Sequence, residues 1–446
     1  MKYLIVPTQQ FSGSVKGKKW VDFSDLPKLV QRFITWTKKR MFVALDESSW
    51  IKTTQAMNEE KKSQRTRVIK TLANYSESRA ILTGTLKSKS PMNLIDQYQF
   101  LDPEYFPESM YEFAERYCIM VTLHTARGRR VIINQKDYKD IRTRLANAYK
   151  RYNEQMYKLT YMKICNSYGL RSEQLEHIIA HKEYSPFMHQ DELMERVAHC
   201  TMTVKREDVF DISYDKAVYE PIMRPVKLDK QAIDMANELI DFGFTDTLVL
   251  GKAPALELVI RLQDICNGFE PIKDEATGLV TYKPLKANPK LDELEALLEE
   301  IGTDDNQVVV WCSRTNAKEA IYERLEKLGI SYVGYSGSEG KAKKAEAEEK
   351  FASGEARVFV ANQAAAAYGL NCLKDCNYIV WFCCDASVER HHQAQHRILR
   401  GQSRTLKFAY MIYVKNSVEE RVIRALNVGE ELLSDNNSKE IFRFAA

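Results

Sequence analysis

Six short runs of apolar residues are spread along the chain, and none of them alternates between apolar and polar positions. A nearly continuous apolar run predicts a strand that is buried on both faces, as in a parallel sheet. Helical stretches such as Ala317–Leu328 and Lys344–Phe351 separate several of the runs. The alternation of strand and helix from Val308 onward therefore predicts βαβ units in an open α/β sheet. The six runs are Tyr3–Pro7, Met41–Leu45, Val308–Cys312, Val358–Ala361, Tyr378–Phe382 and Phe408–Tyr413.

The pattern changes in the middle of the chain, between about residues 105 and 206. This stretch is rich in Tyr, Met, Arg and Glu, and its apolar positions have helical spacing, for example over Asp137–Tyr157. A mostly helical insert is the prediction. A second boundary is expected near Tyr219–Val226, which contains two prolines.

Composition narrows the possible partners and the cellular compartment but does not identify a function. The 446 residues include 65 basic and 61 acidic side chains, a net charge of +4 that permits nucleic-acid binding without arguing for it. Nine cysteines without a C-x-x-C pair are expected to be reduced thiols. No run approaches 18 apolar residues, so we expect a cytoplasmic protein with no membrane partner, in the host cytoplasm if its source is viral.

An acidic pair, Asp46-Glu47, follows the apolar run Met41–Leu45 directly. Ligands of open α/β sheets bind at the carboxyl ends of the strands, where this pair lies. Nucleotide hydrolysis needs two carboxylates there. Asp46 would hold Mg²⁺, largely through water, and Glu47 would orient or deprotonate the attacking water. The alternative is that the pair caps a following helix.

Two further segments carry candidate chemistry. Thr83-Gly84-Thr85 ends another apolar run and can relay the state of the carboxylates to a bound nucleic acid, or it can be an ordinary exit from a strand. Arg397 and Arg400 are spaced i, i+3, which predicts that they share one helix face and act as arginine fingers on a phosphoryl group. The alternatives are a solvated basic helix or contacts with a nucleic-acid backbone.

The order of these features resembles the SWI/SNF-like branch of superfamily 2 helicases and translocases, of phage or bacterial type. The resemblance implies two RecA-like α/β lobes with a helical insert, binding ATP, Mg²⁺ and DNA. The resemblance also implies that Gln393 and Gly369 contact the nucleotide. It further implies that Thr83, Gly84 and Thr85 couple the nucleotide site to the bound DNA. The segments that carry it are Asp46–Lys52, Ile81–Pro103, Arg261–Gly268, Asn288–Asp292, Val358–Asn371 and Gln393–Gln402.

The chain also departs from the family pattern. Ala366 and Ala367 stand where glycines are usual, and Arg400-Gly401-Gln402 is one residue shorter than R-x-G-Q. The phosphate-binding loop G-x-x-x-x-G-K-[ST] is missing. An incomplete first lobe is therefore expected, with a separate polypeptide supplying the loop.

The resulting division is a partial first lobe at residues 1–105, a helical insert at 106–218 and a second lobe at 219–446. The predicted function is an ATP-dependent DNA helicase or translocase subunit that hydrolyses ATP when the phosphate-binding loop is supplied. The alternative left open is a truncated module that binds DNA or a partner without ATP.

Overall fold

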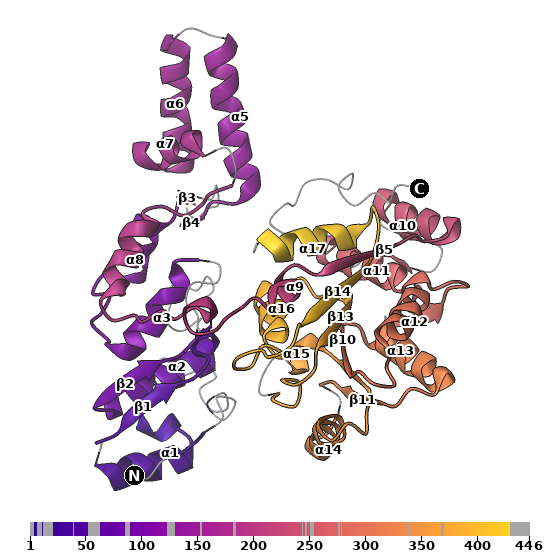
Figure 1. Cartoon of the computed structure of the whole chain (residues 1–446). Coiled ribbons are helices and arrows are strands. Elements are labelled where there is room, and N and C mark those ends of the chain that lie inside the picture. The colour runs from indigo at the N-terminus through magenta and orange to yellow at the C-terminus, as the bar shows by residue number, and fades with distance from the viewer. Residues whose placement is uncertain are drawn as a thin grey trace. The chain divides into compact units, whose positions relative to one another are not determined.

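The computed structural model divides the chain into two compact units, unit 1 at Met1–Met202 and unit 2 at Thr203–Ala446 (Figure 1). The residues described are 4–6, 11, 21–38, 40–51, 63–84, 90–122, 130–151, 154–181, 184–242, 244–245, 248–249, 254–274, 277, 279–337, 339–366 and 370–428.

Unit 2 is built on a six-stranded sheet in the order β11-β12-β10-β13-β14-β5, with every neighbouring pair parallel. The α/β fold predicted from the apolar runs is thereby confirmed, because a parallel sheet flanked by helices is the architecture of a RecA-like lobe. The strands are β5 (Ile222–Val226), β10 (Val308–Cys312), β11 (Tyr332–Tyr335), β12 (Val358–Ala361), β13 (Tyr378–Cys383) and β14 (Phe408–Val414).

Helices cover both faces of this sheet, which explains why its central strands are apolar throughout. Val308 and Val310 of β10 pack with one set of helices, and the alternate residues Val309 and Trp311 pack with the other. The first set is α10 (Lys230–Phe242), α11 (Pro254–Cys266), α12 (Pro289–Ile301) and α13 (Thr315–Leu328). The second is α14 (Lys341–Ala352), α16 (Val388–Gln395) and most of α17 (Val418–Val428).

The two edge strands of this sheet, β5 and β11, were not predicted, and the segment of β5 was interpreted as a boundary. β5 pairs only with β14, so it lies at the edge of the sheet. An edge strand tolerates Pro225, which has no N–H to donate to a second neighbour. The short elements completing unit 2 are η6 (Arg206–Asp208), α9 (Lys216–Tyr219), α15 (Gln363–Ala366) and two hairpins, β6 (Phe244–Thr245) with β7 (Leu248–Val249) and β8 (Phe269–Lys273) with β9 (Val280–Pro284).

Unit 1 contains a pair of parallel strands, β1 (Phe42–Leu45) and β2 (Ser78–Ile81). Residues 4–6 of the first apolar run are described and form no strand, so that part of the prediction was wrong. The elements that precede, separate and follow the two strands are η2 (Phe23–Asp25), α1 (Lys28–Thr37), η3 (Ser48–Ile51), α2 (Gln64–Thr71), η5 (Leu72–Tyr75) and α3 (Met92–Leu101).

The remainder of unit 1 is mostly helical, as its composition predicted. The expected helix over Asp137–Tyr157 is divided between α5 (Gln135–Arg151) and α6 (Glu154–Tyr168), which lie side by side (Figure 1). A small antiparallel hairpin was not predicted. The other elements here are α4 (Met110–Tyr117), β3 (Met120–Thr122), β4 (Arg130–Ile132), α7 (Ser172–Ala180) and α8 (Gln190–Ala198). Among the helices described in either unit, none has the length and apolar character needed to span a membrane.

Candidate nucleotide site

The acidic pair lies in a tight turn at the carboxyl end of β1. Asp46 is exposed, and its Oδ1 accepts a hydrogen bond from the backbone N–H of Glu47 at 3.0 Å. Glu47 has a φ of 51°, a left-handed conformation that few residues other than glycine adopt. Such a conformation costs on the order of 1–3 kcal/mol and is found disproportionately at functional sites. The pair is therefore set by a specific turn, and the 3₁₀-helix η3 begins directly after it at Ser48.

The turn is joined to the end of the neighbouring strand. Leu45 lies opposite Ile81, the N–H of Leu82 donates to the Leu45 carbonyl at 2.9 Å, and the N–H of Ser48 donates to the Leu82 carbonyl at 2.9 Å. Thr83 and Gly84 thus leave β2 at the edge of the strand pair where Asp46 and Glu47 leave β1. Thr85 lies outside the described residues. The structure brings the acidic pair and the Thr-Gly turn together.

Two buried polar residues behind the turn were not predicted from the sequence. The hydroxyl of Ser48 donates to Oε1 of Gln97 in α3 at 2.6 Å, and both side chains are fully buried. A buried hydrogen bond between two uncharged groups holds a turn rigidly, because losing either partner leaves the other unsatisfied. The sequence does contain a sign of such a contact, because the otherwise apolar helix α3 includes the polar residues Asn93, Asp96 and Gln97.

The predicted helix face for Arg397 and Arg400 is wrong. Helix α16 ends at Gln395, and both arginines lie beyond it in a loop. The N–H of Arg397 donates to the Ala394 carbonyl at 3.1 Å, a three-residue turn that closes the helix. Residues 396–403 are called the arginine loop below.

The arginine loop is anchored in the core of unit 2. Ile398 and Leu399 are 1% and 3% exposed and belong to the core on the α14 and α16 face of the sheet. The chain has left the helix at Gln395, and these two residues reach the core from the loop that follows. Arg397 is buried with them, whereas Arg400 is exposed. The two guanidiniums are therefore in different surroundings, and Arg400 is the one open to a ligand.

Helix α16 also carries the predicted nucleotide contact Gln393. This side chain is half-buried, and its Oε1 makes no hydrogen bond within the described part of the chain. On the same helix His391 packs against Trp381 with ring centroids 4.1 Å apart. Burial and the neighbouring His392 lower the pKa of His391 to about 3, so it is neutral at physiological pH. Gly369, the other predicted contact, lies outside the described residues.

The acidic turn suits one kind of metal binding. Mg²⁺ usually keeps several waters and takes one or two carboxylates from the protein. The exposed Asp46 carboxylate fits that mode, while one of its oxygens is oriented by the Glu47 N–H. In the ranges described above, no three His, Cys, Asp or Glu side chains gather to enclose an ion. Asp46 thus fits a hydrated magnesium ion, and no dedicated protein cage for a metal appears among these residues.

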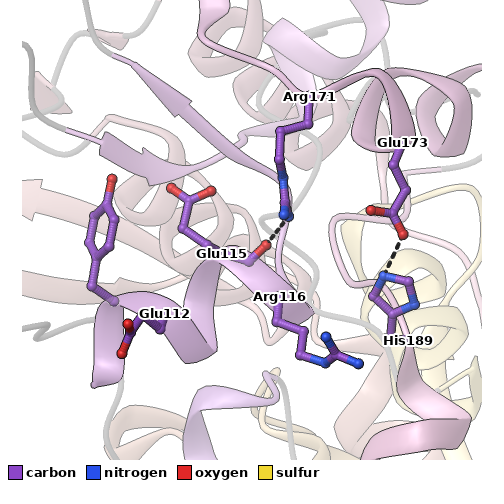
Figure 2. A pocket seen from close by; sticks show the side chains of 7 residues that line it. Glu112, Glu115, Arg116, Arg171, Glu173 and His189 are labelled. Carbon is purple, nitrogen blue, oxygen red and sulfur yellow. Dashed lines mark hydrogen bonds and ion pairs between the residues drawn. The ribbon is translucent and has the colours of Figure 1, made fainter. Parts of the chain in front are cut away.

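A polar hollow of about 400 Å³ in unit 1 contains none of the predicted site residues (Figure 2). Its charges are largely paired. The Nε2 of His189 lies 2.7 Å from a carboxylate oxygen of Glu173, and Arg171 donates to the Glu115 carbonyl. These contacts join α4, α7 and α8, which is a structural role. The lining residues are Tyr111, Glu112, Glu115, Arg116, Arg171, Glu173 and His189.

The part of the chain that matches a known protein family lies in unit 2. Residues 289–402 match the helicase conserved C-terminal domain. This helicase domain begins at the first residue of α12 and ends within the arginine loop. The matched segment therefore contains the central strands of the sheet and both candidate arginines.

One curated relative is the ATP-dependent helicase brm of Drosophila melanogaster. It is 26% identical over 200 residues, which cover 41% of this chain and 12% of the relative. The chain thus matches a small part of a much longer protein. Both similarities are to helicases, and the matched helicase domain lies within unit 2.

Two solved structures are also similar to the chain. The SWI2/SNF2 ATPase core of Sulfolobus solfataricus in complex with dsDNA has a TM-score of 0.40 and 14% identity, covering 93% of this chain and 76% of that one. The C-terminal part of the Fun30 ATPase domain has a TM-score of 0.29 and 14% identity, covering 65% and 82%. At these scores the fold assignment rests on the parallel sheet itself.

Proposed function

We propose that the chain forms the larger part of an ATP-hydrolysing motor that moves on or remodels DNA. The observation that carries the proposal is the helicase C-terminal domain, which ends within the loop bearing Arg397 and Arg400. Asp46 would hold hydrated Mg²⁺, Glu47 would act on the attacking water, and the arginines would neutralise charge on the phosphoryl group. Gln393 would contact the same nucleotide.

The sequence lacks one component of this site. A phosphate-binding loop supplies backbone N–H groups and a lysine to the phosphates, and no G-x-x-x-x-G-K-[ST] occurs in the 446 residues. We propose that a segment outside these residues supplies it, either on a separate polypeptide or elsewhere in a longer protein. The 446 residues alone should then bind ATP weakly.

DNA is the proposed partner, and the charge of one hairpin supports it. Helices α5 and α6 together contain eight Lys and Arg residues against three Asp and Glu, a larger excess than that of the whole chain. Tyr149 on α5 is 76% exposed and offers a ring for stacking. Binding through phosphates would weaken steeply with rising salt.

The test is DNA-stimulated ATP hydrolysis by the chain together with a polypeptide carrying the phosphate-binding loop. We expect Glu47→Gln to abolish turnover and leave nucleotide binding intact, because the carboxylate acts on water. Arg400→Ala should lower the rate on the order of 10³-fold.

Two exposed residues outside the site serve as matched controls. Glu104→Gln and Arg404→Ala change the same kinds of side chain and should leave the rate unchanged. Equal hydrolysis with Gln at position 47 would refute the assignment of the acidic pair.

A further inference from the structure

The segment through which the chain enters unit 2 is hydrogen-bonded to the arginine loop. Unit 2 begins at Thr203, and Arg206 follows three residues later. Its guanidinium donates from Nη1 to the Leu399 carbonyl at 2.6 Å and from Nη2 to the Gly401 carbonyl at 2.7 Å. These two carbonyls lie immediately before and after Arg400. One largely buried side chain therefore holds the backbone on both sides of the exposed arginine.

The guanidinium is itself fixed from the other side. Its Nε donates to Oδ2 of Asp215 at 2.8 Å, and the two side chains are 12% and 0% exposed. A guanidinium presents its donors in a rigid planar fork, so fixing Nε on Asp215 also fixes the direction of both Nη groups. Gly401 has a φ of 70°, and a Cβ added there would meet nothing within 4 Å, so glycine serves the backbone turn and not a lack of space.

A second set of hydrogen bonds joins the segment that follows Arg206 to the arginine loop and the end of α16. The side-chain amide of Gln402 pairs with the backbone of Asp211 in both directions, donating to its carbonyl at 2.9 Å and accepting from its N–H at 3.1 Å. Gln395, at the end of α16, donates to the Val218 carbonyl at 2.6 Å. The segment from Arg206 to Val218 thus follows the arginine loop from the end of α16 to Gln402.

We propose that Arg206 is a positioning residue for Arg400, and that Asp215 and Gln402 complete this support. The inference rests on the proposed function, in which Arg400 acts on the phosphoryl group. Arg206 touches no substrate; it acts by fixing the backbone that carries Arg400. Arg206 lies three residues after the first residue of unit 2.

The decisive variant is Arg206→Lys. Lysine keeps the charge and can still pair with Asp215, but a single ammonium cannot span the two carbonyls in the geometry of the fork. The matched control is Arg324→Lys, since Arg324 in α13 pairs with Asp292 and Glu295 of α12 in the same unit. Two measurements are made: hydrogen exchange of the peptide 396–404 in the full chain, and kcat and KM for ATP in the hydrolysis assay above.

We expect Arg206→Lys to speed exchange of the 396–404 peptide at least about tenfold, because the loop backbone loses the fork that holds it. We expect kcat to fall on the order of 10²-fold at unchanged KM, because a small displacement of a catalytic group has that effect. Arg324→Lys should change neither quantity. If Arg206→Lys fails to fold, Gln402→Ala removes the second set of bonds and is held to the same expectation for exchange.

The two levels of the proposal fail in different ways. Unchanged exchange with Arg206→Lys, while Arg400→Ala is inactive, overturns the positioning role and leaves the proposed function standing. Faster exchange with unchanged kcat in both Arg206→Lys and Arg400→Ala would show that Arg206 holds the loop but would overturn the role of Arg400 in hydrolysis.

Discussion

At the scale of single residues, the structure explains why position 268 requires glycine. Gly268 ends the Arg261–Gly268 segment with a φ of 86°, a backbone conformation that side chains disfavour. A Cβ at this position would lie 2.4 Å from Nδ2 and 2.5 Å from Cγ of Asn288. Asn288 is not free to move away, because Nδ2 donates to the Asn267 carbonyl at 2.7 Å and Oδ1 accepts from the Leu291 N–H at 3.2 Å.

Gly268→Ala should therefore destabilise unit 2 strongly. We expect a loss of more than about 3 kcal/mol of unfolding free energy, because backbone strain and a clash with a held side chain act together. Gly354→Ala is the matched control, since Gly354 has a φ of 81° and nothing within 4 Å of an added Cβ. It should cost only the backbone penalty of about 1–2 kcal/mol. Denaturant titration of both variants measures the difference, and equal losses would show that Asn288 yields.

At the scale of elements, a buried ion pair joins segments that are far apart in sequence. Lys290 at the start of α12 is fully buried and donates to Oε1 of Glu419 in α17 at 2.6 Å and to Oδ1 of Asn267 at 3.1 Å. Oε2 of Glu419 accepts from the Val414 N–H at the end of β14 at 2.8 Å. Burial lowers the pKa of Lys290, but the Glu419 carboxylate outweighs it, and the net pKa is raised. Lys290 therefore stays charged at physiological pH.

Lys290→Met should cost about 3–5 kcal/mol of unfolding free energy, because it leaves the Glu419 carboxylate buried without its cation. Adding Glu419→Leu should recover only part of this loss, since the Val414 N–H then loses its acceptor. The control is Lys350→Met, where a partly exposed lysine pairs with the exposed Glu346 on the same helix, α14, and the melting temperature of the variant should not change. Equal effects of the two lysine substitutions would contradict a structural role for the buried pair.

How far the elements were predictable from sequence follows from their surroundings. The strands β10 and β12 were predicted to the residue, because strands covered on both faces are apolar throughout. The edge strand β5 was missed, since a single neighbour and the prolines in and before it remove that signal. The spacing of Arg397 and Arg400 predicted a shared helix face, but α16 ends at Gln395, and Ile398 and Leu399 enter the core from the loop beyond it. Spacing does not reveal which side chains the tertiary core requires.

The candidate site was predictable only in part for a similar reason. The acidic pair after an apolar run is a local pattern, and the pairing of β1 with β2 follows from parallel-sheet geometry. Arg206 and Asp215 carry no local pattern, because the partners of Arg206 in the arginine loop lie 193 and 195 residues away. Ser48 and Gln97 are likewise joined only by the fold. Such contacts become visible only once the chain is folded.

At the scale of the whole molecule, the candidate residues of one reaction lie in two compact units. Asp46 and Glu47 belong to unit 1, and Gln393, Arg397 and Arg400 belong to unit 2. The helicase C-terminal domain lies entirely within unit 2. Unit 1 holds its candidate residues at the β1–β2 edge, and unit 2 holds its own on α16 and in the arginine loop. We propose that both sets of residues act on one nucleotide.

A double-mutant cycle on kcat tests this claim most directly, using the mild variants Glu47→Asp and Arg400→Lys with the phosphate-loop polypeptide present. Groups that act on the same transferring phosphoryl group are strongly coupled, so their effects on the activation free energy do not add. We expect the double variant to be slower than the worse single variant by less than about tenfold, even if each single change costs about 10²-fold. Full additivity, with the two losses multiplying, would contradict the claim and place the acidic pair and the arginines in separate processes.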